Sequence, residues 1–293
     1  MNYTKKKHPM GFYQAYPIPS QEELDHFYRE EYFQACKSYS YSRDYSEEEM
    51  QFNLTQPIVA DYVWKQASRN KPVGKLIDIG CGEGFFARYF YDHGWEIECC
   101  DLSSFAIERH NPEIMSFFTK NNIFKELDEK ITDNKKYDFI NLSNVLEHVR
   151  EPINLLERVK RIMGRDSILR IKVPNDFSTL QQILLDNGSI SSEYWFSPPG
   201  HLNFFTLTSL KEVLVNCGFS IVKILADFPI EIYLLNKFSN YVVDKSKGAE
   251  AHNAKVVMER YLMDHGTDKY VDFMSVAAEV GLGRTIIVFA EVL

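Results

Sequence analysis

The sequence predicts an α/β fold built on a doubly wound sheet, and three observations support this prediction. From Lys75 onward, short apolar runs alternate with amphipathic segments, a pattern typical of parallel strands covered by helices. A glycine-rich turn follows the first apolar run and precedes a helical pattern. The second apolar run ends at Asp101, about 20 residues after the first glycine of that turn. With 293 residues, 45% of them hydrophobic, the chain is long enough for one large domain with an appendage.

The pattern divides the chain into four segments. We expect an N-terminal lead-in or helical cap over residues 1–70 and the ligand-binding core over 71–228. A helical insertion over 229–283 lies where a substrate cover is needed, and 284–293 forms the last core strand. The insertion contains two helices whose apolar faces are expected to pack in the core. These faces consist of Ala254, Val257, Met258, Tyr261 and Leu262, and of Tyr270, Phe273, Met274 and Ala277.

Within the lead-in, Ser20 and Glu23 form a capping-box pattern that predicts the start of a short helix. The aromatic and polar stretch 39–45 is expected to be a loop. A second helix is predicted from about Pro57 to Ser68, because a polar run and a further proline follow it.

The core is predicted to contain seven strands separated by helices. Each strand is a short apolar run, and each helix carries apolar residues at helical spacing. The stretch 176–206, with Trp195 and Phe196, interrupts this alternation and is expected to be loop-like. The predicted helices are 84–94, 152–163 and 209–217. The predicted strands are 75–80, 96–101, 114–118, 137–143, 167–175, 219–228 and 284–293.

Composition excludes several classes of function. The net charge of −8 and the pI of about 5.6 argue against a nucleic-acid partner, since binding to phosphate backbones requires clustered cations. Without an apolar signal region or a run of about 18 apolar residues, neither secretion nor membrane insertion is expected. The odd number of cysteines and the absence of a CxxC pair favour reduced thiols and a soluble, cytoplasmic protein. The five cysteines are Cys36, Cys81, Cys99, Cys100 and Cys217.

The segment LIDIGCGEG (76–84) carries the strongest functional signal. Its glycines let a ligand approach the main chain closely, and Asp101 is placed to bind the ribose hydroxyls of an adenosine. A dinucleotide fingerprint requires glycine where this chain has Phe85, and no GK[ST] pattern of a P-loop occurs. Asp78 precedes the first glycine by two positions and suits a ligand with an ammonium or sulfonium group. Together these features point to S-adenosylmethionine.

The chain resembles the class I S-adenosylmethionine-dependent methyltransferases. The resemblance follows the order of LIDIGCGEG, CCDLSSFAIE, YDFINLSNVLEHV, VPN and HLNFFTLTSLKEVLVNCGF, and covers roughly residues 57–228 plus the last strand. It is closest to the branch of ubiquinone-type O-methyltransferases and bacterial sugar or polysaccharide methyltransferases. It implies a Rossmann-like, seven-stranded sheet whose last strand runs antiparallel between the fifth and sixth.

The resemblance also implies positions for the methionine end of the cofactor. Asp78 would lie near the methionine ammonium, and Ser143 and Asn144 would face the sulfonium. The product, S-adenosylhomocysteine, would occupy the same site. The residues whose main chain would line the methionine and ribose are Gly80, Cys81, Gly82 and Gly84.

At the adenosine end, the resemblance implies that Asp101 binds the ribose and that Leu102 packs on the adenine. Relatives usually place an acidic residue after the third strand to hold the adenine amino group. This chain has Asn121 and Asn122 there, and Asn122 followed by Ile123 is the best alignment. An amide oxygen can still accept a hydrogen bond from that amino group.

Two histidines fall in segments expected near the methyl group and are the candidate bases. His148 follows the fourth strand, and His201 lies in SPPGHLNFF, where a rigid lead-in holds it among aromatic residues. His148 is equally consistent with a structural role that orders the 144–152 turn, so His201 is the preferred base. Ubiquinone-type relatives carry a Glu-x-x-Glu-His cation site, of which Asn144, Glu147 and His148 remain, and no metal is predicted.

The leading hypothesis is methyl transfer to a hydroxyl of a small acceptor, most plausibly a sugar or glycan precursor. Aromatic loops suit stacking on a ring or sugar face. An N-methyltransferase on an amino sugar and a cofactor-binding protein without turnover are the alternatives. A nicotinamide oxidoreductase is disfavoured by Phe85. The sequence leaves the acceptor and the oligomeric state open.

Overall fold

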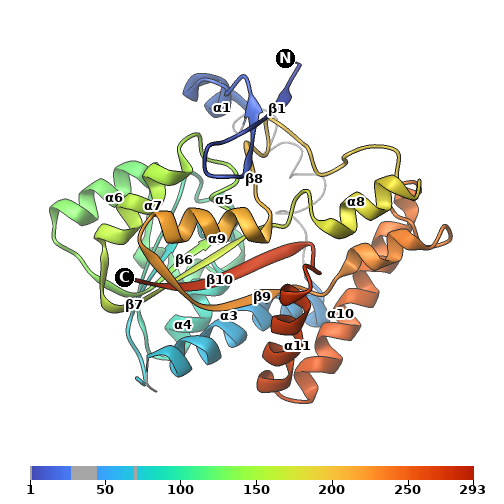
Figure 1. The fold of residues 1–293 in the computed structure, drawn as a ribbon. Helices are drawn as coiled ribbons and strands as arrows, with labels where there is room; N and C mark the ends of the chain where they lie inside the picture. Colours follow the sequence, from blue (N-terminus) through green and yellow to red (C-terminus); the bar gives the residue numbers. More distant parts are fainter. Residues whose placement is uncertain (1, 28–44, 69–70) are drawn as a thin grey trace.

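The computed structural model describes residues 2–27, 45–68 and 71–293 (Figure 1). The loop predicted at 39–45 lies outside these residues, apart from Tyr45. A seven-stranded sheet forms the centre of the molecule. Its strands are β3 (Lys75–Ile79), β4 (Glu96–Asp101), β5 (Phe118–Lys120), β6 (Tyr137–Ser143), β7 (Met163–Pro174), β9 (Phe219–Ala226) and β10 (Thr285–Val292).

The order of these strands in the sheet is β5-β4-β3-β6-β7-β10-β9. β10 is antiparallel to both of its neighbours, whereas the other paired strands are parallel. The predicted Rossmann-like sheet, with an antiparallel last strand between the fifth and sixth, is therefore confirmed.

Helices cover both faces of the sheet (Figure 1). Strand side chains alternate between the faces, so that Ile140 and Leu142 pack in one apolar cluster and Phe139 packs in the other. The helices that contribute to the first cluster are α6 (Ile123–Thr132), α7 (Pro152–Arg161) and α9 (Leu207–Asn216). Those of the second are α3 (Glu47–Ala67), α4 (Phe85–Asp92), α5 (Phe105–His110) and α11 (Thr267–Glu279).

The lead-in contains a small sheet that the sequence does not predict. β1 (Thr4–Lys7) and β2 (Tyr13–Tyr16) pair antiparallel, and β8 (Asn203–Phe204) joins them from the middle of the chain. The four residues of β1 are all exposed, so no apolar alternation marks the strand. The predicted short helix is present as α1 (Gln21–His26), with the Ser20 capping box. Figure 1 shows β1 and α1, in dark blue, at the top of the view, above the main sheet.

The helix predicted from Pro57 begins ten residues earlier, which corrects that prediction. The Ser46 side chain accepts a hydrogen bond from the main-chain N–H of Glu49, and the Glu49 carboxylate accepts one from the main-chain N–H of Ser46. α3 therefore starts with a full capping box. Pro57 lies inside the helix. Proline is common at the start of a helix, so Pro57 suggests a start there, but the capping box at Ser46 is the stronger signal.

The strand predicted at 114–118 is also a correction. Residues Pro112–Phe117 form a 3₁₀ helix, η2, and β5 begins only at Phe118, which pairs with Cys99 of β4. Pro112 fixes a helical φ angle at the first position, and the N–H of Ile114 bonds to the carbonyl of Asn111. Ile114 is buried, as an inward-facing strand residue would also be, so its apolar character could not distinguish a strand from a 3₁₀ helix.

The interruption at 176–206 is not only loop, because it contains α8 (Thr179–Asp186) and β8. Ser178 and Gln181 form a capping box that gives the helix a recognisable start. In the insertion, the structure has the two predicted helices, α10 (Gly248–Asp264) and α11, preceded by the 3₁₀ helices η3 (Ile230–Leu235) and η4 (Lys245–Lys247).

Core packing is confirmed for most of the predicted face of α11 but is wrong for most of that of α10, of which Leu262 packs against the second apolar cluster. Tyr270 and Met274 of α11 are buried. On α10, by contrast, Val257 is 64% exposed and Tyr261 is 55% exposed. α10 instead turns polar groups inward, where Lys255 pairs with Asp227 and Glu259 accepts a hydrogen bond from Tyr270. The other exposed apolar residues of the predicted faces are Met258 and Phe273.

In the described parts of the chain, no helix is both long and apolar enough to cross a membrane. The four cysteines within those parts, Cys81, Cys99, Cys100 and Cys217, are free thiols.

Replacing Ser46 by alanine should lower the free energy of unfolding by about 1 kcal/mol, because the first turn of α3 loses its capping hydrogen bond. Ser46→Asp keeps an acceptor at that position and should retain most of the stability. Urea unfolding of the three proteins checks this. Equal stability of Ser46→Ala and the unchanged protein would contradict a helix start at this residue.

Candidate functional site

The carboxyl ends of the parallel strands border a cavity of about 800 Å³. This edge is where open α/β sheets bind their ligands. From the lead-in, Gln21 and Leu24 of α1 line the cavity, whereas none of residues 229–283, all of which are described, does so. The predicted site residues that line it are Asp78, Gly80, Cys81, Gly82, Asp101, Asn122, Ile123, Ser143, Asn144, His148 and His201.

The glycine-rich turn brings the main chain to the wall of this cavity. Gly80 has a φ angle of 73°, and a Cβ atom added there would lie 2.5 Å from Cγ2 of Val145. Gly84, in contrast, does not line the cavity. It is the N-cap of α4 with φ 80°, and its Cα faces the Ile107 side chain. Gly84 therefore lies at the start of α4 and not, as expected from the resemblance, in the wall of the cavity.

Asp101 is held by the main chain at the end of β4. Its Oδ2 accepts a hydrogen bond from the N–H of Gly82 at 3.0 Å, and its Oδ1 accepts one from Ser103 at 3.2 Å. Burial raises the pKa of this carboxyl, and these N–H donors oppose the increase. Leu102 is 47% exposed and lies outside the cavity lining, which instead includes Phe105.

Asn122 lines the cavity but also starts a helix. Its Oδ1 accepts a hydrogen bond from the N–H of Phe124 at 3.0 Å, which caps α6. The neighbouring Asn121 donates from Nδ2 to Glu126 and accepts from the N–H of Asn122. The amide group of Asn122 therefore has a structural role beside the ligand contact expected of it.

A row of polar side chains crosses three neighbouring strands beneath the cavity. Asn141 Nδ2 donates to Asp78 Oδ1 at 2.6 Å, and Arg170 Nη1 donates to Asn141 Oδ1 at 2.7 Å. All three side chains are about 1% exposed. Asp78 Oδ2 is buried with no hydrogen-bond partner in the described part of the chain. Burial raises the pKa of Asp78 to about 6.

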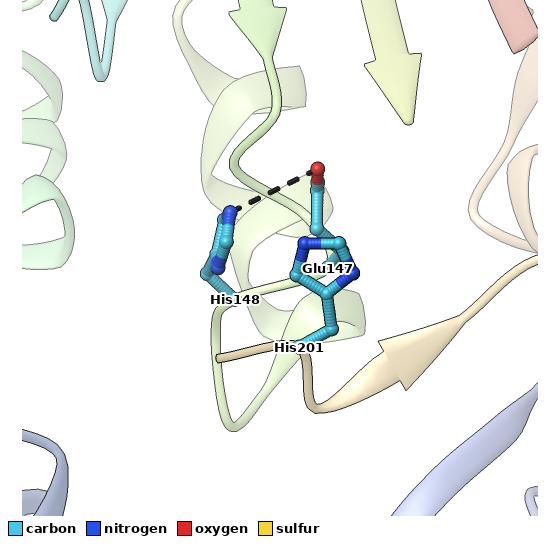
Figure 2. Close-up of side chains that lie close together, drawn as sticks. All are labelled: Glu147, His148 and His201. Atoms are coloured by element: carbon cyan, nitrogen blue, oxygen red, sulfur yellow. Dashed lines mark ion pairs between the residues drawn. The ribbon is translucent and has the colours of Figure 1, made fainter. Parts of the chain in front are cut away.

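Glu147, His148 and His201 form a second cluster at the same cavity (Figure 2). One ring nitrogen of each histidine and one carboxylate oxygen of Glu147 all lie within 4.8 Å of one another. His148 Nε2 is 3.9 Å from Glu147 Oε1, and its Nδ1 is 2.6 Å from the carbonyl oxygen of Gly200. A carbonyl oxygen only accepts hydrogen bonds, so Nδ1 carries the proton and Nε2 presents its lone pair.

Backbone hydrogen bonds bring these distant segments together. The carbonyl of Glu147 accepts from the N–H groups of Leu202 and Asn203 at 2.8 and 3.0 Å. The buried Asn203 side chain donates to the carbonyls of Leu146 and Val149. Asn203 was not among the predicted residues, although it follows His201 in the segment HLNFF. The pairing of the 144–151 turn with this segment explains why the two histidines meet.

Burial controls the protonation of the cluster. It raises the pKa of Glu147 to about 8, so this carboxyl carries a proton near neutral pH. The pKa of His148 is lowered by burial, and that of His201 is lowered to about 3 by burial and by the neighbouring His148. Both imidazoles are therefore neutral at pH 7. Glu147 Oε2 and His201 Nδ1 are buried without a hydrogen-bond partner among the described residues.

The same three residues offer the donor set that a divalent transition metal uses, two imidazole nitrogens and one carboxylate oxygen. Ligand atoms around a tetrahedral metal lie roughly 3.3 Å apart, given metal–nitrogen bonds of about 2.0 Å. The 4.8 Å spread is wider than this, so the side chains would have to move together to share one ion.

Comparison with known families gives one match over more than half of the chain. A family model described as "Methyltransferase domain" matches residues 51–224. A ubiquinone biosynthesis O-methyltransferase of Glaesserella parasuis is 26% identical over 154 residues, which are 49% of this chain and 63% of that protein. A protein of the same name from Rickettsia bellii is 28% identical over 94 residues, 29% of this chain and 38% of its own length. The chain thus spans less than two thirds of these curated relatives.

Solved structures show the same fold at low identity. The crystal structure of a SAM-dependent methyltransferase from Archaeoglobus fulgidus aligns with a TM-score of 0.54 and 18% identity over 89% of this chain and 100% of that one. The plantazolicin methyltransferase BpumL, in complex with SAH, aligns with a TM-score of 0.53 and 16% identity, covering 92% and 93% of the two chains. At these identities, the likeness confirms the fold alone.

Glu147→Gln should become increasingly more stable than the unchanged protein as the pH rises. The folded protein holds a proton on Glu147 up to about pH 8, whereas an unfolded glutamate loses it near pH 4.3, so the free energy of unfolding falls between these values. Glutamine is neutral at every pH and should remove this loss, which amounts to a few kcal/mol.

Urea unfolding of both proteins between pH 5 and 8.5, with a chelator present, measures the effect. Glu129→Gln, the same change on an exposed side chain of α6, is the matched control. A stability difference between Glu147→Gln and the unchanged protein that stays constant with pH would show that Glu147 is ionised in the folded state.

Proposed function

The chain belongs to the Methyltransferase domain family, and on this premise we propose that it moves the methyl group of S-adenosylmethionine to a hydroxyl of a small acceptor. The observation that carries the proposal is the arrangement at one edge of the sheet. There a buried carboxylate oxygen without a partner, on Asp78, shares a cavity with Asp101 and with the His148–His201 pair.

The residues present fit S-adenosylmethionine. Asp78 Oδ2 offers a buried acceptor for the methionine ammonium, and Asp101 lies at the end of the next strand for the ribose hydroxyls. Gly80 brings its main chain to the cavity, where a side chain at this position would collide with Val145. Phe105 and Phe124 give the cavity apolar walls for a purine ring.

S-adenosylmethionine supplies a methyl group on a positively charged sulfur, which leaves as the neutral thioether of S-adenosylhomocysteine. The bond from carbon to sulfur breaks as the bond from carbon to the acceptor oxygen forms. The protein's main task is then to hold the acceptor oxygen in line with that bond. Ser143 and Asn144, at the end of β6, are the side chains we expect nearest the sulfur.

We assign the base to His148, which reverses the order that the sequence suggests. The Gly200 carbonyl accepts the Nδ1 proton of His148, so that Nε2 carries the lone pair that takes the hydroxyl proton. Glu147, whose carboxyl is protonated near neutral pH, lies 3.9 Å from that nitrogen, too far for a hydrogen bond, and takes no part in this transfer. His201 Nδ1 has no hydrogen-bond partner among the described residues, so no such contact sets which of its ring nitrogens presents a lone pair. His201 packs edge-on against His148 and limits how that ring can turn.

For the acceptor, we propose a hydroxyl on a small ring, with a sugar or glycan precursor as the first class to test. Both apolar and polar side chains line the cavity, as a ring with several hydroxyls requires. The names of the curated relatives favour oxygen over nitrogen as the methylated atom. N-methylation of an amino sugar, and cofactor binding without turnover, remain the competing hypotheses.

A screen for acceptor-dependent formation of S-adenosylhomocysteine separates these hypotheses. Nucleotide sugars, amino sugars and phenols form the panel. Turnover with a hydroxyl acceptor supports the proposal, and turnover only with amines supports the N-methyltransferase. Strong cofactor binding with no turnover on any member would favour the binding protein.

Asp101→Ala should weaken the binding of S-adenosylhomocysteine without unfolding the protein. The change removes charge-assisted hydrogen bonds to two ribose hydroxyls, worth about 1.5–3 kcal/mol each. Calorimetric titration measures the dissociation constant, and NAD, which should not bind, is the control ligand. An unchanged dissociation constant would show that the ribose is held elsewhere.

His148→Ala should lower kcat by about 10²–10⁴-fold with little change in cofactor affinity, because a base acts only on the acceptor. His201→Ala should lower kcat less. Turnover should survive a chelator, since the proposed base needs no metal. Loss of activity on chelation, restored by a divalent cation, would instead assign the cluster to a metal. Near-normal turnover in His148→Ala would exclude it as the base.

A further inference from the structure

The polar row beneath the cavity occupies matching positions on three parallel strands. Asp78 of β3 is the register partner of Asn141 on β6, and Asn141 is the partner of Arg170 on β7. Their side chains point to the face covered by α3, α4 and α11, where the neighbouring positions hold apolar residues such as Phe139. A buried row of this kind is expensive to form unless every member is satisfied.

Arg170 connects this row to its surroundings. Its Nη1 donates to Asn141 Oδ1 at 2.7 Å and to Ser143 Oγ, and its Nη2 donates to Gln56 Oε1 of α3 at 2.7 Å. The guanidinium also lies over the Phe86 ring, 5.0 Å from its centre. These contacts fix the guanidinium at the centre of the sheet.

The direction of each bond determines which atom faces the ligand. Because the Asn141 oxygen accepts from Arg170, its Nδ2 must point to Asp78, where it occupies Oδ1. This leaves Oδ2 of Asp78 as the atom without a partner, on a residue that lines the cavity. The proposed methionine ammonium would bind there.

We propose that Arg170 is a positioning residue for the cofactor. Its guanidinium orients the Asn141 amide and keeps Asp78 as a carboxylate aimed at the ammonium group of S-adenosylmethionine. Arg170 does not line the cavity, so it acts only through Asn141, Ser143 and Asp78. The proposal rests on the proposed function, because it assumes that this ammonium is the ligand of Asp78.

The charges around Asp78 determine the expected pH dependence. Arg170 on β7 stabilises the carboxylate, whereas Asp101 on β4 and burial destabilise it. The thiols of Cys81 and Cys100 also lie near, and α4 contributes the N–H of Ala87. On the far side, Tyr270 of α11 and Lys172 are near Arg170, whose pKa is lowered to about 10 and which therefore stays cationic.

With the arginine present, the pKa of Asp78 is about 6, so affinity for an ammonium ligand should rise with pH to a plateau near pH 7. Without the arginine, the pKa should be higher, and the same rise should occur at higher pH. The loss of affinity is then largest near neutral pH and smaller at pH 8.5.

The experiment compares two ligands that share the adenosine but differ at the methionine end. S-adenosylhomocysteine carries the ammonium group, and 5′-methylthioadenosine does not. Dissociation constants are measured by calorimetry between pH 5.5 and 8.5 for the unchanged protein, Arg170→Met and Arg170→Lys. Arg88→Met, which removes a surface arginine paired with Asp92 and Glu113, controls for the loss of one positive charge.

Arg170→Met should weaken S-adenosylhomocysteine binding about tenfold at pH 7, with the midpoint of the pH profile at higher pH, and should leave 5′-methylthioadenosine binding unchanged. Arg170→Lys keeps the charge but cannot donate to both Asn141 and Gln56. Its affinity for S-adenosylhomocysteine should therefore lie between those of the unchanged protein and Arg170→Met. Arg88→Met should match the unchanged protein. If Arg170→Met does not fold, the shifted profile of Arg170→Lys is the test.

Two results would overturn the proposal while leaving the proposed function intact. One is an unchanged pH profile for S-adenosylhomocysteine in both Arg170 variants. The other is an equal loss of affinity for the two ligands, which a purely structural role would produce. Failure of the unchanged protein to bind S-adenosylhomocysteine at any pH would overturn the proposed function, and the role of Arg170 with it.

Discussion

The site depends on one constraint, a charged pair buried inside a sheet whose other side chains are mostly apolar. Asp78 and Arg170 cannot both be desolvated without a connecting hydrogen bond, and Asn141 supplies it. The parallel register of β3, β6 and β7 places the three at one level, directly beneath the glycine-rich turn. The same geometry that neutralises the pair leaves one oxygen of Asp78, a residue that lines the cavity, without a hydrogen-bond partner among the described residues.

Next to this polar row, the part of the cavity that holds the two histidines is built from two segments far apart in sequence. The Glu147 carbonyl binds the main chain of the segment that carries His201, and the Gly200 carbonyl binds the His148 ring. The two segments position each other, so the place of each histidine depends on both of them. The cofactor side follows from strand register, whereas the acceptor side follows from this mutual contact.

The predicted parts of the fold are those with local signals. Alternating apolar runs located six of the seven strands of the main sheet, and the turn at Gly80 with Asp101 identified the ligand edge. Where two local signals compete, the predicted elements are wrong. Pro57 suggests a later helix start than the true one after Ser46, and the apolar Ile114 suits either a strand or a 3₁₀ helix. The sequence could not reveal residues whose role arises from contacts between strands. Arg170 stands in the apolar run SILRIKVPN, and only its neighbours in the sheet show what it binds.

The central claim is that this cavity holds S-adenosylmethionine by its two ends. A crystal structure of the protein with S-adenosylhomocysteine tests it most directly. We expect the ligand ammonium within hydrogen-bond distance of Asp78 Oδ2, both ribose hydroxyls on Asp101, and the sulfur between Ser143 and His148. A ligand bound away from Asp78 and Asp101, or a cavity that stays empty at saturating ligand, would contradict it.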